Sequence, residues 1–208
     1  GRVQTNLLIE AYYTKLKHIF VVSPIGYDEE GNKILERRNG SGAKVKGINL
    51  EGKIIPHRDV QIQLGISLQQ NKYNRPQSWS DDPDTKKTRE MLRSPNRYGY
   101  FTFFTSPFKK FGISASGTYT GSMYVPHMAG YIEKDKLEKS GDFFDANIKL
   151  NYDFTISRNY VFQFNCGIPN IFQSYRRDFG RGTFRDAGYI YAPGLPRSWF
   201  AGIKLSLN

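Results

Sequence analysis

Few residues of this 208-residue chain have the types and spacing that catalysis or metal binding requires. The histidines, His18, His57 and His127, lie far apart and show no ligand spacing. His57 falls in a short turn-like segment, where we expect it to be solvated. The single cysteine, Cys166, excludes a disulfide framework and a cysteine-based zinc site. No Gly-x-Ser-x-Gly elbow offers a hydrolase nucleophile. We therefore expect no metal, no cofactor and no enzymatic activity.

The residues best suited to binding are aromatic rings and arginines in polar segments. Exposed rings beside hydrogen-bonding groups suit recognition of a bulky chelate or a sugar. The same side chains can instead pack one loop against another, and the sequence leaves both roles open. The substrate-binding candidates are Tyr27, Trp79, Tyr124, His127, Tyr131, Tyr175, Arg176 and Arg177.

The elements that must position these residues are long runs in which apolar and polar residues alternate. Clear runs lie at 60–69, 111–125, 144–156 and 199–207, and weaker ones lie at about 3–20, 44–56, 97–107 and 160–172. A period of two over such lengths is typical of a strand with one apolar and one polar face. The sequence therefore predicts about eight strands. No apolar run approaches the length of a transmembrane helix.

Short and long connections alternate between these runs. Tight turns are expected at 56–59, 107–110 and 157–159, and long polar loops at roughly 23–42, 70–96, 125–142 and 173–197. Long loops without structure of their own are uncommon in compact soluble domains. Outer-membrane barrels, by contrast, combine short periplasmic turns with long extracellular loops. The predicted fold is all-β, an antiparallel transmembrane β-barrel segment of about eight strands.

A soluble β-sandwich is the alternative, in which the polar faces would be solvated rather than lining a barrel. Strands of 10–14 residues favour the barrel, because globular strands usually have about 5–6 residues. The residues expected to line the interior are Asn49, Glu51, Lys53, Asp145, Lys149 and Asp153. Those expected in aromatic girdles near strand ends are Phe111, Tyr119, Phe154, Tyr160 and Trp199.

Two motifs near the C-terminus give a resemblance. Residues 185–205, RDAGYIYAPGLPRSWFAGIKL, contain a Pro-Arg pair, an aromatic residue, a glycine and a final alternating run. Residues 169–175, PNIFQSY, look like an Asn-Leu-Phe-x-x-Tyr signature. In both respects the chain resembles TonB-dependent outer-membrane receptors. It departs from them in its last residues, Leu207 and Asn208, where the family usually has an aromatic residue.

The resemblance implies a larger barrel of about 22 strands with a plugged lumen. Residues 1–208 would then be the C-terminal part of a β-barrel domain, with the plug domain and the N-terminal barrel strands absent from this chain. The implied partners are those remaining strands and the plug, the inner-membrane TonB energy-coupling complex acting through the plug, and outer-membrane lipid and lipopolysaccharide.

The implied function is TonB-dependent import, across the bacterial outer membrane, of a bulky nutrient such as a ferric siderophore or a corrinoid. One alternative is a self-contained eight-stranded barrel acting as an anchor or adhesion surface, in which 5–13 would pair with 199–207. A small outer-membrane enzyme is a third hypothesis, disfavoured because no catalytic set is present.

The net charge of +11 does not indicate nucleic acid as a partner. Basic residues are mixed with acidic ones in the loops and form no single stripe, so lipopolysaccharide phosphates are the more economical partner. The segment 173–197 carries five basic residues against Asp178 and Asp186, together with several rings. We expect it to be ordered and to fold inward over the barrel mouth, where it would suit anionic cargo.

Overall fold

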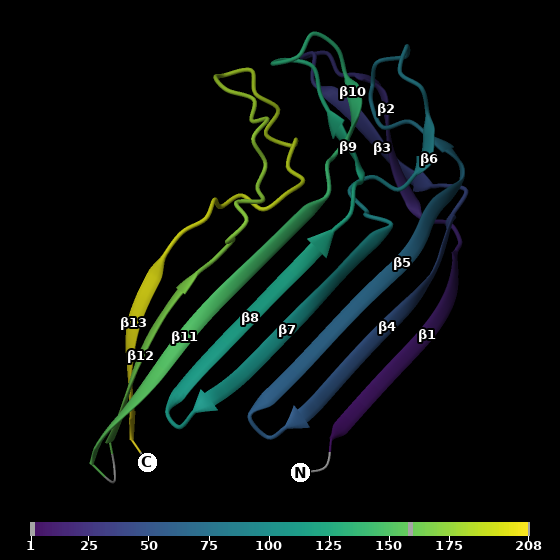
Figure 1. Cartoon of the computed structure of the whole chain (residues 1–208). Coiled ribbons are helices and arrows are strands. Elements are labelled where there is room, and N and C mark those ends of the chain that lie inside the picture. The colour runs from purple at the N-terminus through teal and green to yellow at the C-terminus, as the bar shows by residue number, and fades with distance from the viewer. Residues whose placement is uncertain (1–2, 158–159, 208) are drawn as a thin grey trace.

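One antiparallel sheet dominates the computed structural model, which describes residues 3–157 and 160–207. Over these residues no helix is long and apolar enough to cross a membrane. The eight main strands are paired in chain order, which confirms the predicted number (Figure 1). In spatial order they are β1 (Gln4–Leu16), β4 (Ala43–His57), β5 (Val60–Gln77), β7 (Arg97–Phe108), β8 (Phe111–Thr120), β11 (Phe143–Ser157), β12 (Tyr160–Ile168) and β13 (Phe200–Leu207), with β6 (Thr88–Glu90) paired to β5.

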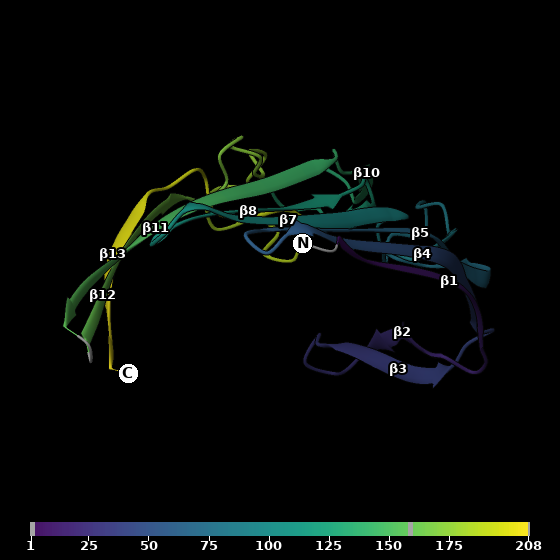
Figure 2. The ribbon, with the colours of Figure 1, turned by 60° about the horizontal axis from the view of Figure 1, so that its bottom comes forward.

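The sheet is open and curved, like a piece of a barrel wall (Figure 2). β1 and β13 lie at its opposite edges and do not pair with each other. The prediction of a self-closed eight-stranded barrel is therefore wrong, and the prediction of a barrel segment is confirmed. In lipid, the unpaired backbone groups at both edges would each cost several kcal/mol, so this fold needs neighbouring strands.

The strand register separates the two faces of the sheet. Six apolar residues of the alternating runs, Ile62, Leu64, Ile148, Leu150, Ile203 and Leu205, all lie on one face. Leu64 is 56% exposed and Ile203 is 68% exposed, so this apolar face is uncovered. The sandwich prediction is wrong, because a sandwich would pack these side chains together in a core.

The opposite face is polar, and its side chains bond across strands. Ser67 Oγ donates to Asn49 Oδ1 at 2.8 Å, and Asn49 Nδ2 donates to Glu10 Oε2 at 2.8 Å. Gln163 Nε2 donates to Asp153 Oδ1 at 2.8 Å. The residues predicted to line the interior all lie on this face: Asn49, Glu51, Lys53, Asp145, Lys149 and Asp153.

Aromatic rings lie over glycines at several cross-strand positions. Gly65 is the direct partner of Tyr100, and Gly117 is the direct partner of Phe101. A Cβ on either glycine would come within 3.0 Å of the partner's ring, so the ring occupies the space that a side chain would fill. The same arrangement occurs in the pairs Gly47–Tyr12 and Gly167–Phe200.

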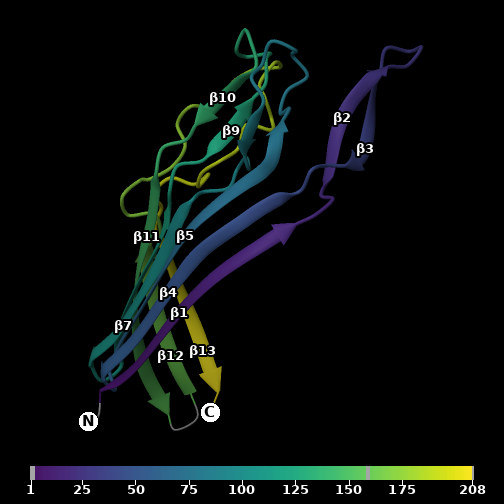
Figure 3. The same cartoon turned by 90° about the vertical axis from the view of Figure 1, so that its right-hand side faces the viewer.

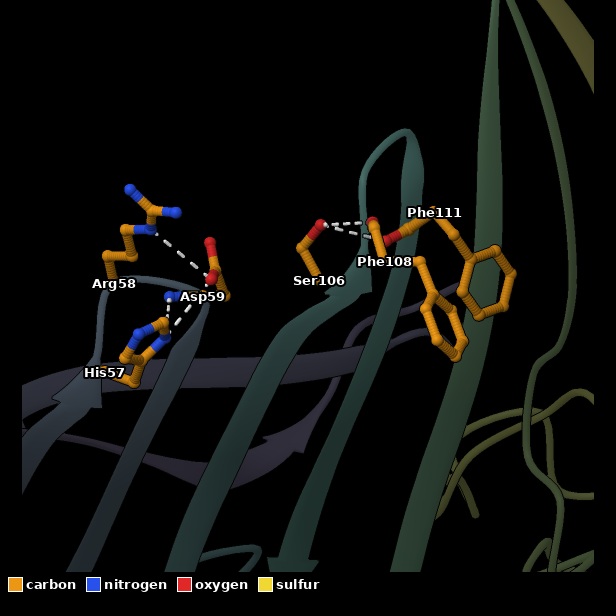
Figure 4. Close-up of polar contacts among 6 residues, drawn as sticks. All are labelled: His57, Arg58, Asp59, Ser106, Phe108 and Phe111. Atoms are coloured by element: carbon orange, nitrogen blue, oxygen red, sulfur yellow. Dashed lines mark hydrogen bonds and ion pairs between the residues drawn. The ribbon is translucent and has the colours of Figure 1, made fainter.

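Two short turns join strands at the end of the sheet where the chain termini lie (Figures 1 and 4). In the β4–β5 turn, Asp59 Oδ2 lies 3.1 Å from His57 Nδ1 and 3.5 Å from Arg58 Nε. In the β7–β8 turn, Ser106 Oγ donates to the backbone oxygen of Phe111 at 2.9 Å. The His57 side chain is exposed, as expected. The third predicted turn includes residues 158 and 159, which lie outside the described residues.

The long connections gather at the other end (Figures 1 and 3). Two of them were expected to be loops but contain hairpins, β2 (Phe20–Tyr27) with β3 (Lys33–Asn39) and β9 (Tyr124–His127) with β10 (Lys136–Lys139). β5 also continues to Gln77, well into the expected loop at 70–96. Pairing in hairpins satisfies the backbone groups of these polar segments, which alternation alone does not reveal. The segment 173–197 contains no strand.

Candidate functional site

Asn170 fixes both ends of the long segment 173–197, which we call the C-terminal loop. Its backbone has a φ of 49°, a conformation that asparagine tolerates better than most residues. Its side-chain nitrogen donates to the backbone oxygens of Ser174 at 3.1 Å and Leu195 at 2.9 Å, and its side-chain oxygen accepts from the Ser174 amide. The side chain is almost fully buried. The asparagine of the PNIFQSY motif therefore holds the two ends of the loop together by hydrogen bonds to both.

Arg176 organises the middle of the C-terminal loop. Only 6% of this residue is exposed. Its guanidinium donates from Nε to Asp178 Oδ1 and from Nη2 to the Asp178 backbone oxygen, both at 3.1 Å. The guanidinium carbon lies 4.4–5.1 Å from the ring centroids of three residues, Phe179, Tyr189 and Tyr191. We call these five residues the arginine hub.

The Asp178 carboxylate receives hydrogen bonds from both hub tyrosines. Tyr191 Oη donates to Oδ1 at 2.6 Å, and Tyr189 Oη donates to Oδ2 at 2.9 Å. Burial raises the pKa of Asp178, but the bonds from Tyr191, Tyr189 and Arg176 outweigh burial and lower it overall. Burial and the bond to Asp178 raise the pKa of Tyr191 to about 12 and raise that of Tyr189 as well. The hub therefore carries a stable carboxylate with neutral tyrosines at physiological pH.

The C-terminal loop packs against the β9–β10 hairpin. The ring of His127 stacks on Tyr189 with centroids 3.8 Å apart and an angle of 6° between the planes. Asp186 Oδ2 accepts from the Met128 amide at 2.8 Å. On the other side, the Tyr191 ring lies 5.9 Å from Phe143, a residue on the polar face of β11. The C-terminal loop therefore reaches the polar side of the sheet, the side toward which it was predicted to fold. That it is ordered and covers the mouth of a barrel stays a prediction.

A cavity of about 600 Å³ lies between the hairpin and the C-terminal loop. Three cations line it, Lys139, Arg177 and Arg181. The carboxylates of its lining are engaged elsewhere, because Glu138 pairs with Lys136 at 2.7 Å and Asp178 pairs with Arg176. The remaining lining residues are His127, Tyr131, Ile132, Phe179, Tyr189 and Tyr191. The cavity therefore combines rings with cations that retain capacity to bind an anion.

The structure brings together half of the predicted binding residues. His127, Tyr131 and Arg177 line the cavity, and Arg176 is buried in the hub, whose other four residues line the cavity. The burial of Arg176 and its two hydrogen bonds to Asp178 favour a structural role for this side chain. Tyr175 is beside the site, with its ring 5.4 Å from the Arg177 guanidinium carbon.

The other three candidates do not line the cavity. Tyr124 is on β9, where it is the cross-strand partner of the lining residue Lys139. Tyr27 is exposed on the β2–β3 hairpin. Trp79 donates from Nε1 to the Lys86 backbone oxygen at 2.9 Å and lines a separate hollow beside β2.

Glu138 and Lys139 were not among the predicted site residues. Their segment pairs with β9, and only this pairing brings them to the cavity. The four-residue alternation of β10 is too short to distinguish a strand from a loop in the sequence. The described residues hold no group of three or more His, Cys, Asp or Glu side chains that could bind a metal ion.

Comparison with known proteins gives structural matches only. No protein-family model and no curated protein sequence matches the chain. It is similar to the ferric-catecholate import receptor Fiu from E. coli, with a TM-score of 0.66 and 17% identity over 98% of this chain. It is also similar to the copper transporter OprC (TM-score 0.63, 11% identity, 98% of this chain) and to a variant of the ferric enterobactin receptor PfeA from Pseudomonas aeruginosa (TM-score 0.61, 14% identity, 96% of this chain).

The matches cover only a part of each larger protein. This chain spans 25% of Fiu, 28% of PfeA and 30% of OprC. All three are receptors or transporters rather than enzymes, and identities this low speak to the fold. The open, curved, antiparallel sheet with short turns at one end and long loops at the other therefore has the fold of a piece of the outer-membrane barrel wall of TonB-dependent receptors.

Proposed function

We propose that the chain forms the C-terminal barrel wall and extracellular loops of an outer-membrane, TonB-dependent importer. In this proposal the apolar face contacts lipid, the polar face lines the lumen, and the long loops lie outside the cell. The remaining strands and a plug domain belong to the rest of the barrel. The cargo is a bulky nutrient, a ferric siderophore in the first instance or else a corrinoid.

The cation-lined cavity between the β9–β10 hairpin and the C-terminal loop carries the proposal. Arg177 and Arg181 are exposed, and Arg181 has no carboxylate partner among the described side chains. Their guanidinium groups can each donate two parallel hydrogen bonds to an anionic oxygen pair, and the surrounding tyrosines can stack on an aromatic chelate. The neighbour Fiu is described as a ferric-catecholate import receptor, which supports this class of cargo.

The proposed transport step involves no covalent chemistry. Cargo binds among the extracellular loops and the plug, and the inner-membrane complex then pulls on the plug. This opens a path along the polar face, where hydrogen-bonded residues such as Asn49, Ser67 and Gln163 present a hydrophilic wall. A smooth polar wall lets a bulky solute pass without a deep binding site that would trap it.

The test is uptake by cells that produce the complete transporter. Replacing Arg177 and Arg181 together by alanine should reduce uptake of an iron-55-labelled ferric catecholate by tenfold or more, because hydrogen bonds to charged groups contribute about 1.5–3 kcal/mol each. The matched control removes the same charge at the turn end, as Arg58→Ala with Lys109→Ala, and should leave uptake unchanged. A labelled corrinoid serves as the second cargo.

Two results would reject the proposal. One is uptake of both cargoes that persists in cells without the inner-membrane energy-coupling complex. The other is full uptake by the Arg177→Ala, Arg181→Ala variant when its amount at the cell surface equals that of the wild type. The buried Arg176 is tested separately, since its loss would disturb the loop as well as any contact with cargo.

A further inference from the structure

Four lysines gather on the apolar face at the loop end of the sheet. Lys44 of β4 lies directly opposite Lys15 of β1 on one side and Lys72 of β5 on the other. Lys46 lies two residues from Lys44 on the same strand and therefore on the same face. β1, β4 and β5 are adjacent strands (Figure 1). The four residues therefore form one patch, which we call the lysine patch.

The patch begins where the apolar surface ends. On β5 the apolar face runs through Val60, Ile62, Leu64, Ile66 and Leu68, and the next two positions on that face are Gln70 and Lys72. From Val60 to Leu68 the strand rises about 27 Å, which at the usual tilt of about 40° covers most of an apolar band of about 25 Å. The lysines therefore lie at the level of lipid headgroups, not in the hydrocarbon and not far above it.

The register of the patch is unfavourable unless an anion is present. Like charges directly opposite each other on neighbouring strands destabilise a sheet. Lys72 is offset by an ion pair with Glu90 at 2.7 Å. Lys15, Lys44 and Lys46 are exposed and have no carboxylate within ion-pair distance among the described side chains. Their mutual repulsion would be relieved by a multivalent anion that binds several of them at once.

A groove beside the patch indicates that this anion is part of a lipid. The groove is a shallow, open depression of about 520 Å³, and its lining includes Tyr13, Lys46, Ile48, Leu68 and Gln70. Tyr13 and Gln70 are the cross-strand partners of Lys46, and Ile48 and Leu68 lie one row further into the apolar band. A free phosphate has no apolar part that could contact Ile48 and Leu68, whereas a sugar or acyl chain bonded to a phosphate would cover them.

We propose that the lysine patch is a binding site for the phosphate groups of an outer-leaflet glycolipid. The ammonium groups bind the phosphates, and the groove takes the adjoining apolar part of the same molecule. The site is separate from the cation-lined cavity, which lies among the extracellular loops. The inference rests on the membrane placement of the proposed function but not on transport, so lipid binding and cargo uptake are measured independently.

The experiment measures binding of lipid A to the complete barrel in neutral detergent. Native mass spectrometry is used with lipid A that carries both phosphates, lipid A stripped of phosphate, and inorganic phosphate. The test variant is Lys15→Gln, Lys44→Gln, Lys46→Gln. Each lysine near an anionic surface contributes about fivefold, so the three together should weaken binding of the phosphorylated lipid about a hundredfold. The control variant, Arg58→Gln, Lys109→Gln, Lys110→Gln, removes equal charge at the turn end and should bind normally.

A second readout separates the site from ordinary surface charge. In neutral detergent without lipid, the triple lysine variant should be at least as stable as the wild type, because repulsion across the strands is removed. Addition of phosphorylated lipid A should raise the melting temperature of the wild type and not that of this variant. Equal binding of phosphate-free lipid A would overturn the proposal, as would equal loss in the control variant. Binding of inorganic phosphate as tight as that of the lipid would overturn the lipid assignment.

Discussion

Replacing Arg176 by alanine should release the C-terminal loop while leaving the sheet intact. The wild-type guanidinium makes two hydrogen bonds to Asp178 and lies over three rings. A hydrogen bond to a charged group contributes about 1.5–3 kcal/mol, and a cation–π contact about 0.5–2 kcal/mol. The side chain of Asp178 is 50% exposed, so solvent screening reduces the ionic part. We expect a net loss of about 3 kcal/mol in loop docking, less than the sum because these contacts share one side chain.

Hydrogen exchange of single amides measures this loss directly. The amide of Tyr189 donates to the Asp186 backbone oxygen within the loop, and its exchange reports loop opening. A loss of about 3 kcal/mol corresponds to exchange about a hundredfold faster. The amide of Leu150 in β11 serves as the internal reference and should be unaffected. Arg176→Lys should give an intermediate rate, because lysine keeps the charge but not the planar donor pair. An unchanged rate at Tyr189 in Arg176→Ala would refute the idea that Arg176 holds the loop.

Three further changes test other parts of the structure. Leu150→Arg on the lipid-facing side should lower stability of the barrel in bilayers by about 2–4 kcal/mol, measured by urea unfolding; an unchanged midpoint would contradict this placement. Gly65→Val should cost about 1–3 kcal/mol by overpacking against Tyr100, and adding Tyr100→Ala should recover part of it in a thermal melt. The lowered pKa of Asp178 means that its carboxylate stabilises the loop fully above its unfolded value of about 3.9, and this contribution is lost as pH falls through the folded pKa. The protection factors of the loop amides, which correct for the intrinsic pH dependence of exchange, should therefore stay constant from pH 8 to about 5 and fall only below about pH 4. A fall near pH 6 would point to another group.

The sequence predicted the sheet well because its signal is repeated in every strand. Along β5, the polarity of each residue from Val60 to Leu68 predicts which face of the sheet it occupies. The register in the structure agrees with these predicted faces. The turns at 56–59 and 107–110 were equally accessible, since Pro, Asp and Lys interrupt the alternation there. In a sheet with one apolar and one polar face, the alternation of polarity thus specifies where each strand lies and which face each of its residues occupies.

The candidate site could be predicted only in part. The density of rings and arginines in 173–197 identified the loop, but no local pattern distinguishes Arg176, which is buried, from Arg177, which is exposed. Their difference arises from contacts with Tyr189 and Tyr191, more than ten residues away. The contribution of Lys139 depends on pairing between β9 and β10. Such long-range pairing has no counterpart in a single short segment of sequence.

The rings that lie over glycines have a consequence for assembly of the wall. Alternating polarity rejects a strand that inserts one residue out of step, because every side chain would change medium. It cannot reject a slip of two residues, which restores the alternation. After such a slip, Tyr100 would face Gln63 or Ser67 in place of Gly65, and Phe101 would face Ala115 or Tyr119 in place of Gly117. Each ring would then collide with a side chain where a vacant position is needed. The glycine–aromatic pairs thus disfavour register shifts by an even number of residues, which the hydrophobic pattern alone would permit.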